Sequence, residues 1–399
     1  MVTTLDTPTP GIAGTAAAAG VEFGFSEDQE LIREQVRRFA EERIRPGVEE
    51  RDREHRFPAE VIAELAELGL LGMLVEEEYG GAEVDTLTNM LASEELARVC
   101  PSTAVTVSVS NSVCCWPISQ FGSAELKRRV LPALATGEAL GGFGLTEPGS
   151  GSDAASLRTT ARRDGDSWVL DGEKAWITNA GFAKYYVVLA RTDPAAGKRG
   201  ISGFVVPADA PGFAVGKPEE KLGLNASRTA QIFFNGCRIP AGNLLGAEGE
   251  GLRIAFATLT HSRLGIAAQA LGIHQRALEL AVAYAKDRVQ FGVPIAQHQA
   301  IQLKIAQMAT DLAAARALTY AAATVDHGPQ AGRLAAQAKL FASEAANRAC
   351  QESLQIHGGN GFHADYEISR LYRDVRVTTI YEGTSEMQRL VIARALLRK

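Results

Sequence analysis

The stretch Gly144-Leu145-Thr146-Glu147-Pro148-Gly149-Ser150-Gly151-Ser152-Asp153 marks the point where the character of the sequence changes. It predicts a strand that runs into a Gly/Ser turn, whose backbone N–H groups can approach carbonyl or phosphate oxygens closely because glycine leaves room. Residues 149–154 also fit the GxGxxG/A pattern of dinucleotide-binding folds. That pattern needs a helix after the turn, whereas residues 155–178 are broken by two Asp-Gly pairs and predict strands. A Rossmann site is therefore rejected.

Segments of helical periodicity lie on both sides of this stretch. We expect residues 1–22, which are rich in Thr, Pro, Ala and Gly, to form a flexible tail. Residues 23–140 predict an N-terminal helical domain, residues 141–243 a small antiparallel β domain, and residues 244–399 a C-terminal four-helix bundle. The predicted fold class is mostly α with a central β domain (α+β).

Local signals predict where individual elements begin and end. Ser26 to Gln29 form a capping box before a first helix, which Pro46 and Gly47 are expected to end. Residues 103–120 predict one continuous helix. Asp164-Gly165-Asp166 and Asp171-Gly172 each predict a turn between short strands. The helices expected in the C-terminal part are 252–287, 297–325, 331–357 and 387–397.

Composition excludes several classes of protein. The 41 Lys and Arg residues against 47 Asp and Glu residues give a net charge of −6, which disfavours nucleic-acid binding. Five cysteines without a CxxC spacing indicate neither a disulfide framework nor a zinc site. The seven histidines show no metal-ligand spacing, and no apolar run is long enough to cross a membrane. We expect a cytoplasmic protein with no metal, membrane or nucleic-acid partner.

Three further strings follow along the chain, and each has an ordinary structural explanation. Gly172 to Asn179 places a Trp in a strand, where it is usually a core residue. Gln355 to Phe362 ends a predicted helix, which Gly-Gly would simply cap. Tyr381 to Glu386 precedes the last helix, where Thr384 or Ser385 would serve as the N-cap.

Taken together with Gly144 to Asp153, these strings resemble the acyl-CoA dehydrogenase family, flavoenzymes that desaturate acyl thioesters between Cα and Cβ. The chain looks most like the short-chain (butyryl) branch, on residues that include Asn111-Ser112 and Arg263 to Ala267. The resemblance implies FAD as the cofactor and an electron-transfer flavoprotein as the electron acceptor. It also implies a homotetramer in which a neighbouring subunit completes each active site.

The resemblance assigns roles to individual residues. Glu382 is the implied base, which takes the Cα proton while the Cβ hydride passes to flavin N5. Packing should raise its pKa from about 4.3 towards neutrality. Ser262, at the position where some family members carry the base, cannot serve. The implied flavin contacts are Leu145, Thr146, Trp176, Thr178, Thr384 and Glu386, with Arg288, Phe291, Gln355 and Gly359 from the neighbouring subunit. The implied substrate contacts are Ser152, Arg263, Tyr381 and Gly383.

Departures from the family pattern leave the substrate open. Thr260 stands where relatives usually have Asp near the CoA contact, and Asn225 and Arg228 also differ, so an acyl carrier protein thioester is an alternative to acyl-CoA. Trp116 either lines the acyl pocket, which would favour a short or branched chain, or packs between helices. Ala104 argues against a dicarboxylic substrate. An oxygen-using acyl-thioester oxidase and a non-catalytic thioester-binding protein are the alternative functions.

Overall fold

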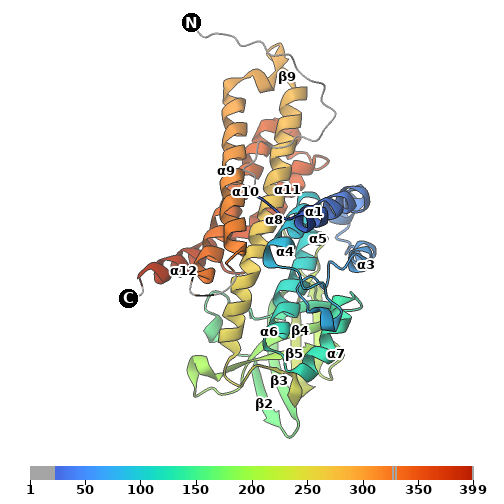
Figure 1. The fold of residues 1–399 in the computed structure, drawn as a ribbon, viewed down its shortest axis with the longest axis vertical. Helices are drawn as coiled ribbons and strands as arrows, with labels where there is room; N and C mark the ends of the chain where they lie inside the picture. Colours follow the sequence, from blue (N-terminus) through green and yellow to red (C-terminus); the bar gives the residue numbers. More distant parts are fainter. Residues whose placement is uncertain (1–22, 326–327, 329, 398–399) are drawn as a thin grey trace.

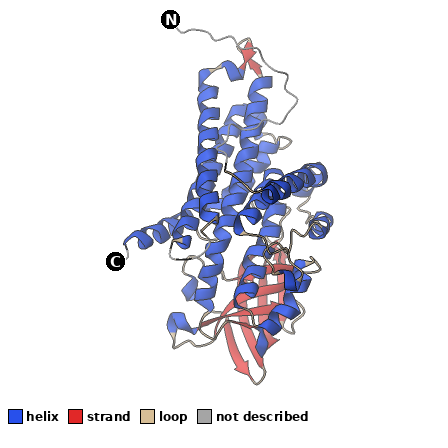
Figure 2. Cartoon of the chain, viewed as in Figure 1, coloured by secondary structure: helices blue, strands red, loops and turns tan. Residues whose placement is uncertain are grey.

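The computed structural model describes residues 23–325, 328 and 330–397, so the expected flexible tail at 1–22 lies outside the described residues. A helical part, a β-sheet and a second helical part follow one another along the chain, which confirms the predicted fold class (Figure 2). The sheet lies at one end of an elongated molecule. The long helix α8 (Gly251–Asp287) runs from the sheet to the other end, where it packs against α9 (Gln299–Ala323) and α10 (Ala331–His357) (Figure 1).

The N-terminal helices begin with the expected capping box. Ser26 Oγ accepts a hydrogen bond from the Gln29 N–H at 3.2 Å, and Gln29 Oε1 accepts one from the Ser26 N–H at 3.0 Å. The expected stop lies at Pro46-Gly47, because Gly47 leaves the helical conformation with φ −114° and ψ 8°. Pro46 lies in the first turn of a 3₁₀ segment (Arg45–Gly47), where its missing N–H costs nothing, and the chain continues into the next helix. These helices are α1 (Glu27–Phe39), α2 (Val48–Arg53), α3 (Ala59–Glu67), α4 (Thr86–Val99), α5 (Pro101–Val109), α6 (Trp116–Phe121) and α7 (Ala124–Ala135).

The helix expected over residues 103–120 is also interrupted. A π-helical segment, Ser110–Cys115, separates α5 from α6. Such segments mark a local widening of the helix. Within it, Asn111 is fully buried and its side-chain amide donates to the Leu70 carbonyl at 2.8 Å. This hydrogen bond ties the π-helical segment to the turn that follows α3.

The central sheet is mostly antiparallel and runs in the order β6-β7-β3-β2-β4-β5-β8, with β1 added in parallel beside β4. The turn expected at Asp164 to Asp166 is confirmed by the pairing of Asp164 with Ser167. The turn expected at Asp171-Gly172 is wrong. The strand continues there through a bulge. Gly172 has φ 137°, and a Cβ at this position would lie 2.8 Å from Thr159, so glycine is the residue that fits the bulge. The strands are β1 (Leu140–Gly144), β2 (Thr160–Asp164), β3 (Ser167–Thr178), β4 (Ala183–Arg191), β5 (Ile201–Pro207), β6 (Phe213–Pro218), β7 (Thr229–Pro240) and β8 (Leu244–Leu245).

The C-terminal helices pack closely because alanine dominates their facing sides. Ala267, Ala270, Ala342 and Ala346 are all at most 1% exposed in one continuous core. The first of the long helices, α8, has 37 residues and is therefore about 55 Å long. The part is completed by β9 (Val289–Gln290), β10 (Val293–Pro294), α11 (Glu367–Val375) and α12 (Ser385–Leu397). Among the described residues, no helix is long and apolar enough to cross a membrane.

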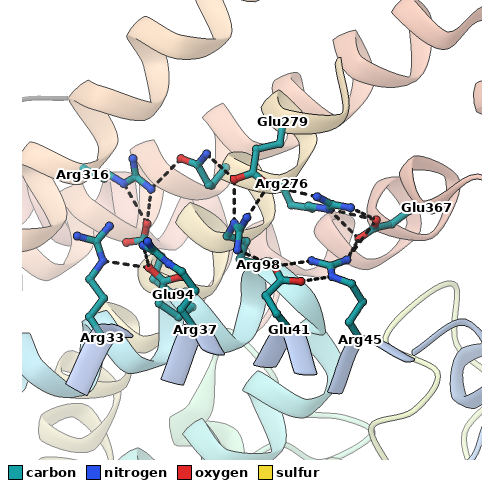
Figure 3. Close-up of polar contacts among 12 residues, drawn as sticks. Arg33, Arg37, Glu41, Arg45, Glu94, Arg98, Arg276, Glu279, Arg316 and Glu367 are labelled. Carbon is teal, nitrogen blue, oxygen red and sulfur yellow. Dashed lines mark hydrogen bonds and ion pairs between the residues drawn. The ribbon is translucent and has the colours of Figure 1, made fainter. Parts of the chain in front are cut away.

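A chain of ion pairs joins the N-terminal helices to the C-terminal ones (Figure 3). Arg98 on α4 contacts Glu41 at 2.8 Å and Glu279 on α8 at 2.8 Å. Arg276 on α8 contacts Glu367 on α11 at 2.6 Å, and Glu367 also pairs with Arg45 at 3.3 Å. Networks of half-buried pairs hold geometry better than isolated surface pairs. This network ties α8, which contributes residues to the site described next, to α4 and α11.

Candidate active site

The loop between the last two helices carries Glu382 in an uncommon backbone conformation. Glu382 has φ 52° and Gly383 has φ 94°, and only glycine adopts such values without cost. Lys339 Nζ donates a hydrogen bond to the Gly383 carbonyl at 2.7 Å. Gln388 Nε2 donates to the same carbonyl at 2.8 Å and to the Glu382 carbonyl at 3.3 Å. Donors from α10 and α12 therefore hold this strained loop in place.

The carboxyl group of Glu382 is enclosed by residues of α8 and α10. Its Oε2 atom is fully buried and has no hydrogen-bond partner among the described residues. Burial raises the pKa of Glu382 to about 7, while the Ser262 hydroxyl, Lys339 and Arg263 act in the opposite direction. This is the direction expected from the sequence. A carboxylate with a pKa near neutrality is suited to accept a proton from carbon.

An apolar surface lies beside this loop. Tyr381 packs against a cluster that includes Val105 and Val109 on α5 and Leu224 from the β domain. The Tyr381 hydroxyl is hydrogen-bonded to the side chain of Gln269 on α8. The Tyr381 ring is therefore fixed at both ends, and the cluster presents aliphatic side chains next to the residue that precedes Glu382.

The first two strings identified in the sequence meet in space. The Thr146 carbonyl accepts a hydrogen bond from the Ala175 N–H at 2.9 Å. Lys174 Nζ donates to the Leu145 carbonyl at 3.3 Å and to Glu147 Oε1 at 2.7 Å. Leu145, Thr146, Trp176 and Thr178 thus form one region at the junction of β1 and β3.

This region has the properties of a surface that binds a flat aromatic group. Trp176 is 61% exposed and has φ 62°, so it is not the core residue that a Trp in a strand usually is. Beyond it, a Cβ added at Gly149 or Gly151 would meet nothing within 4 Å, which leaves the turn open to a ligand. An exposed indole beside an open Gly/Ser turn fits the ring system and ribityl chain of a flavin.

The residues implied to hold the adenine end of FAD lie elsewhere in the chain. They are Arg288, Phe291, Gln355 and Gly359. The Asn360 side chain donates to the Tyr284 hydroxyl at 3.0 Å, so the ends of α8 and α10 are adjacent. A rise of about 1.5 Å per residue places Arg288 roughly 38 Å along α8 from Arg263. Phe291 is 94% exposed there. One chain therefore does not bring the two groups of flavin residues together.

The implied substrate contacts Ser152 and Arg263 line one cavity of about 700 Å³. It lies between the Gly/Ser turn and the helices α8, α10 and α12. Burial lowers the pKa of Arg263, and the nearby Glu382 opposes this shift. The cavity wall also includes Thr260, Phe256 and three further basic side chains, Lys198, Arg333 and Arg394. Its lining combines apolar surface with these basic groups and one acidic residue, Asp153.

Three of the remaining residues have structural contacts of their own. Thr384 Oγ1 accepts a hydrogen bond from the Met387 N–H at 3.3 Å, which caps α12. Glu386 is exposed in the first turn of that helix, and its pKa is lowered first by a backbone hydrogen bond. Trp116 stacks on His261, with ring centroids 4.9 Å apart and planes at 7°. Trp116 therefore packs between helices, which was one of its two expected roles.

Sequence reasoning missed two lysines that hold the site together. Lys174 and Lys339 are both 0% exposed, although lysine is almost never fully buried without a partner. The sequence carries a signal for Lys339, because this residue lies on the same face of the helix as the buried residues Ala335 and Ala342. A lysine in phase with buried alanines indicates a buried polar contact rather than a solvated face.

Three family models cover almost the whole described chain. The acyl-CoA dehydrogenase N-terminal domain matches residues 26–138, the middle domain matches 142–237 and the C-terminal domain matches 249–397. The mouse mitochondrial short-chain specific acyl-CoA dehydrogenase is 49% identical over 93% of this chain and 90% of its own length.

Solved structures agree with these matches. The butyryl-CoA dehydrogenase of Megasphaera elsdenii superposes with a TM-score of 0.92 at 42% identity, over 95% of this chain and 100% of its own. A chain in the structure of the electron transferring flavoprotein of Acidaminococcus fermentans superposes with a TM-score of 0.93 at 45% identity, with the same coverage. A glutaryl-CoA dehydrogenase of Mycobacterium smegmatis in complex with FADH2 gives a TM-score of 0.88 at 36% identity, over 94% of this chain and 96% of its own.

Proposed function

The chain belongs to the acyl-CoA dehydrogenase family, and from this premise we propose that it oxidises a short-chain acyl-CoA with Glu382 as the base. As a member of the family it is an FAD-dependent oxidoreductase that acts on a CH–CH bond. The observation that carries the proposed role of Glu382 is its buried Oε2 atom, which has no partner among the described residues and belongs to a group with a pKa of about 7.

When bound, FAD supplies the acceptor for the hydride that leaves Cβ. The residues that would hold its ring end are Leu145, Thr146, Trp176 and Thr178. Glu382 accepts the Cα proton, which an unpartnered carboxylate oxygen can do without first breaking a hydrogen bond. No hydrogen bond from the Glu382 backbone N–H is found to any residue the structure describes, so this donor is free to bind the thioester oxygen as negative charge develops on it.

Three observations support acyl-CoA with a short acyl chain. The basic side chains around the cavity that Ser152 and Arg263 line, namely Lys198, Arg333 and Arg394, suit the several phosphate groups of CoA better than the single phosphodiester of a carrier protein arm. The aliphatic cluster of Val105, Val109 and Leu224, with Tyr381 packed against it, places apolar side chains next to the base, which suits an unbranched or branched acyl chain. Relatives at 49% and 42% identity are named short-chain specific and butyryl-CoA dehydrogenases.

The partners follow from the same reasoning. The length of α8, which separates Arg288 and Phe291 from the proposed ring-end residues, supports a flavin site shared with a second copy of the chain, as in the expected homotetramer. An electron-transfer flavoprotein is the proposed electron acceptor, and the superposition with a chain in the structure of one such flavoprotein supports it.

The test is anaerobic bleaching of the bound flavin by a panel of acyl-CoAs and acyl carrier protein thioesters. Butyryl-CoA should bleach the flavin fastest, and Glu382→Gln should bind FAD normally yet remain coloured. Normal bleaching of Glu382→Gln would refute the base assignment. Faster bleaching by acyl carrier protein thioesters, or rapid reoxidation by oxygen, would replace the substrate or the acceptor proposed here.

A further inference from the structure

Lys339 is a fully buried lysine that the proposed reaction does not use. It lies on α10 with 0% of its surface exposed, and its ammonium group donates to the Gly383 carbonyl at 2.7 Å. No carboxylate among the described residues forms an ion pair with it. Burying an ammonium group without an ion pair is costly, so its retention needs a reason. The reason lies in the loop that it contacts.

Two side chains of different kinds donate hydrogen bonds to one carbonyl of that loop, the carbonyl of Gly383. Gln388 Nε2 donates to the Gly383 carbonyl at 2.8 Å, and Gln388 is also fully buried. One donor is charged and comes from α10, whereas the other is neutral and comes from α12. Because Glu382 and Gly383 both have positive φ, these two donors hold a strained peptide. Only Lys339 adds charge.

The electrostatic surroundings of Glu382 can be named. Arg263 on α8 and Lys339 on α10 each favour the ionised carboxylate, and the Ser262 hydroxyl acts in the same direction. Tyr381 is the adjacent titratable group, and burial raises its pKa well above the usual value, so it stays neutral. Glu382 is the strongest of the carboxylates that favour the ammonium form of Lys339, Glu344 and Glu386 add to its effect, and Arg263 opposes it. Lys339 and Arg263 are thus the cations that counteract the rise in the pKa of Glu382 caused by burial.

We propose that Lys339 is a positioning residue for the base, whose ammonium group fixes the Gly383 carbonyl and supplies positive charge that favours the ionised form of Glu382. This inference rests on the proposed role of Glu382.

The direction of the effect follows from the charges. Burial lowers the pKa of Lys339 to about 8, so the ammonium form still predominates at pH 7. Without that charge, less positive charge offsets the effect of burial on Glu382. The pKa of Glu382 should therefore rise by about one unit. From a starting pKa of about 7, this change leaves roughly fivefold less ionised base at pH 7. Loss of the hydrogen bond alone would loosen the loop without this shift.

The experiment compares Lys339→Met with the matched control Gln388→Met in the FAD-loaded protein. Each variant removes one buried donor from the Gly383 carbonyl, but only the first removes a charge. The pKa of Glu382 is measured by infrared difference titration of the protonated carboxyl band, assigned by its absence in Glu382→Gln. The pH dependence of kcat/KM with butyryl-CoA is measured in parallel. Lys339→Gln, which keeps a donor but loses the charge, is the second variant if Lys339→Met does not fold.

Lys339→Met and Lys339→Gln should both raise the Glu382 pKa by about one unit, and Gln388→Met should move it by less than about 0.3 unit. An unchanged pKa in both lysine variants, or an equal shift in Gln388→Met, would overturn the proposal. The infrared titration needs no substrate, so it reports on Lys339 even if no acyl-CoA bleaches the wild-type flavin. If no acyl-CoA bleaches the wild-type flavin, the proposed function is refuted, but the effect of Lys339 on the pKa of Glu382 is still tested.

Discussion

Lys174→Met should destabilise the protein strongly, because it breaks an ion pair that is almost fully buried. Lys174 is 0% exposed, and its Nζ lies 2.7 Å from Glu147 Oε1. Removing one partner of a buried pair typically costs about 3–5 kcal/mol. Glu147 would keep the Arg158 N–H at 2.6 Å and the Thr159 N–H at 2.9 Å. We therefore expect the lower end of this range, about 3 kcal/mol.

The assay is urea unfolding at fixed protein and FAD concentrations, with flavin fluorescence recorded alongside. Lys184→Met is the matched control, because the Lys184 pair with Glu138 has side chains that are 56% and 73% exposed and should contribute about 0.5 kcal/mol at most. Lys174→Met combined with Glu147→Gln should recover part of the loss, since no buried charge is then left unpaired. A Lys174→Met variant within 1 kcal/mol of the wild type would refute the reasoning.

Three further predictions concern the site. Flavin reduction by butyryl-CoA should accelerate with rising pH through about 7, since Glu382 must be ionised to accept a proton; a flat stopped-flow profile between pH 5.5 and 8.5 would contradict this. Trp176→Ala should weaken FAD binding up to about tenfold in fluorescence titrations while apoprotein melting stays unchanged, because the indole is 61% exposed; a lower melting temperature would instead indicate a core role. Arg288→Ala and Glu382→Gln should each be inactive alone, yet about a quarter of the sites should work in co-expressed mixtures, and no recovery of turnover would exclude sites shared between subunits.

Periodicity was enough to predict the order of the three parts and most helices. It failed at residues 103–120, which a π-helical segment interrupts, and at Asp171-Gly172, where the strand continues. Asn111 in the π-helical segment donates to the Leu70 carbonyl, and Gly172 allows a bulge against Thr159. Both outcomes depend on tertiary neighbours that local sequence does not contain.

The residues of the candidate site were predicted from the sequence motifs. The buried lysine that holds the base loop in place was not. Glu382, Trp176 and Ser152 stand in motifs with a recognisable spacing. Lys339 lies 43 residues before Glu382, and the two meet only because α10 and the last loop pack together. Long-range contacts of this kind leave no local pattern beyond an isolated lysine among alanines.

The length of α8 has a consequence for how the protein obtains its cofactor. Because the proposed flavin residues lie at opposite ends of this helix, a lone chain offers only half of a binding site. Binding of FAD and association of subunits are then linked equilibria, so each promotes the other by mass action. Dilution of the protein at constant FAD should release flavin, and excess FAD should hold dilute subunits together. The supply of cofactor in the cell would thereby set the amount of assembled enzyme as well as its activity.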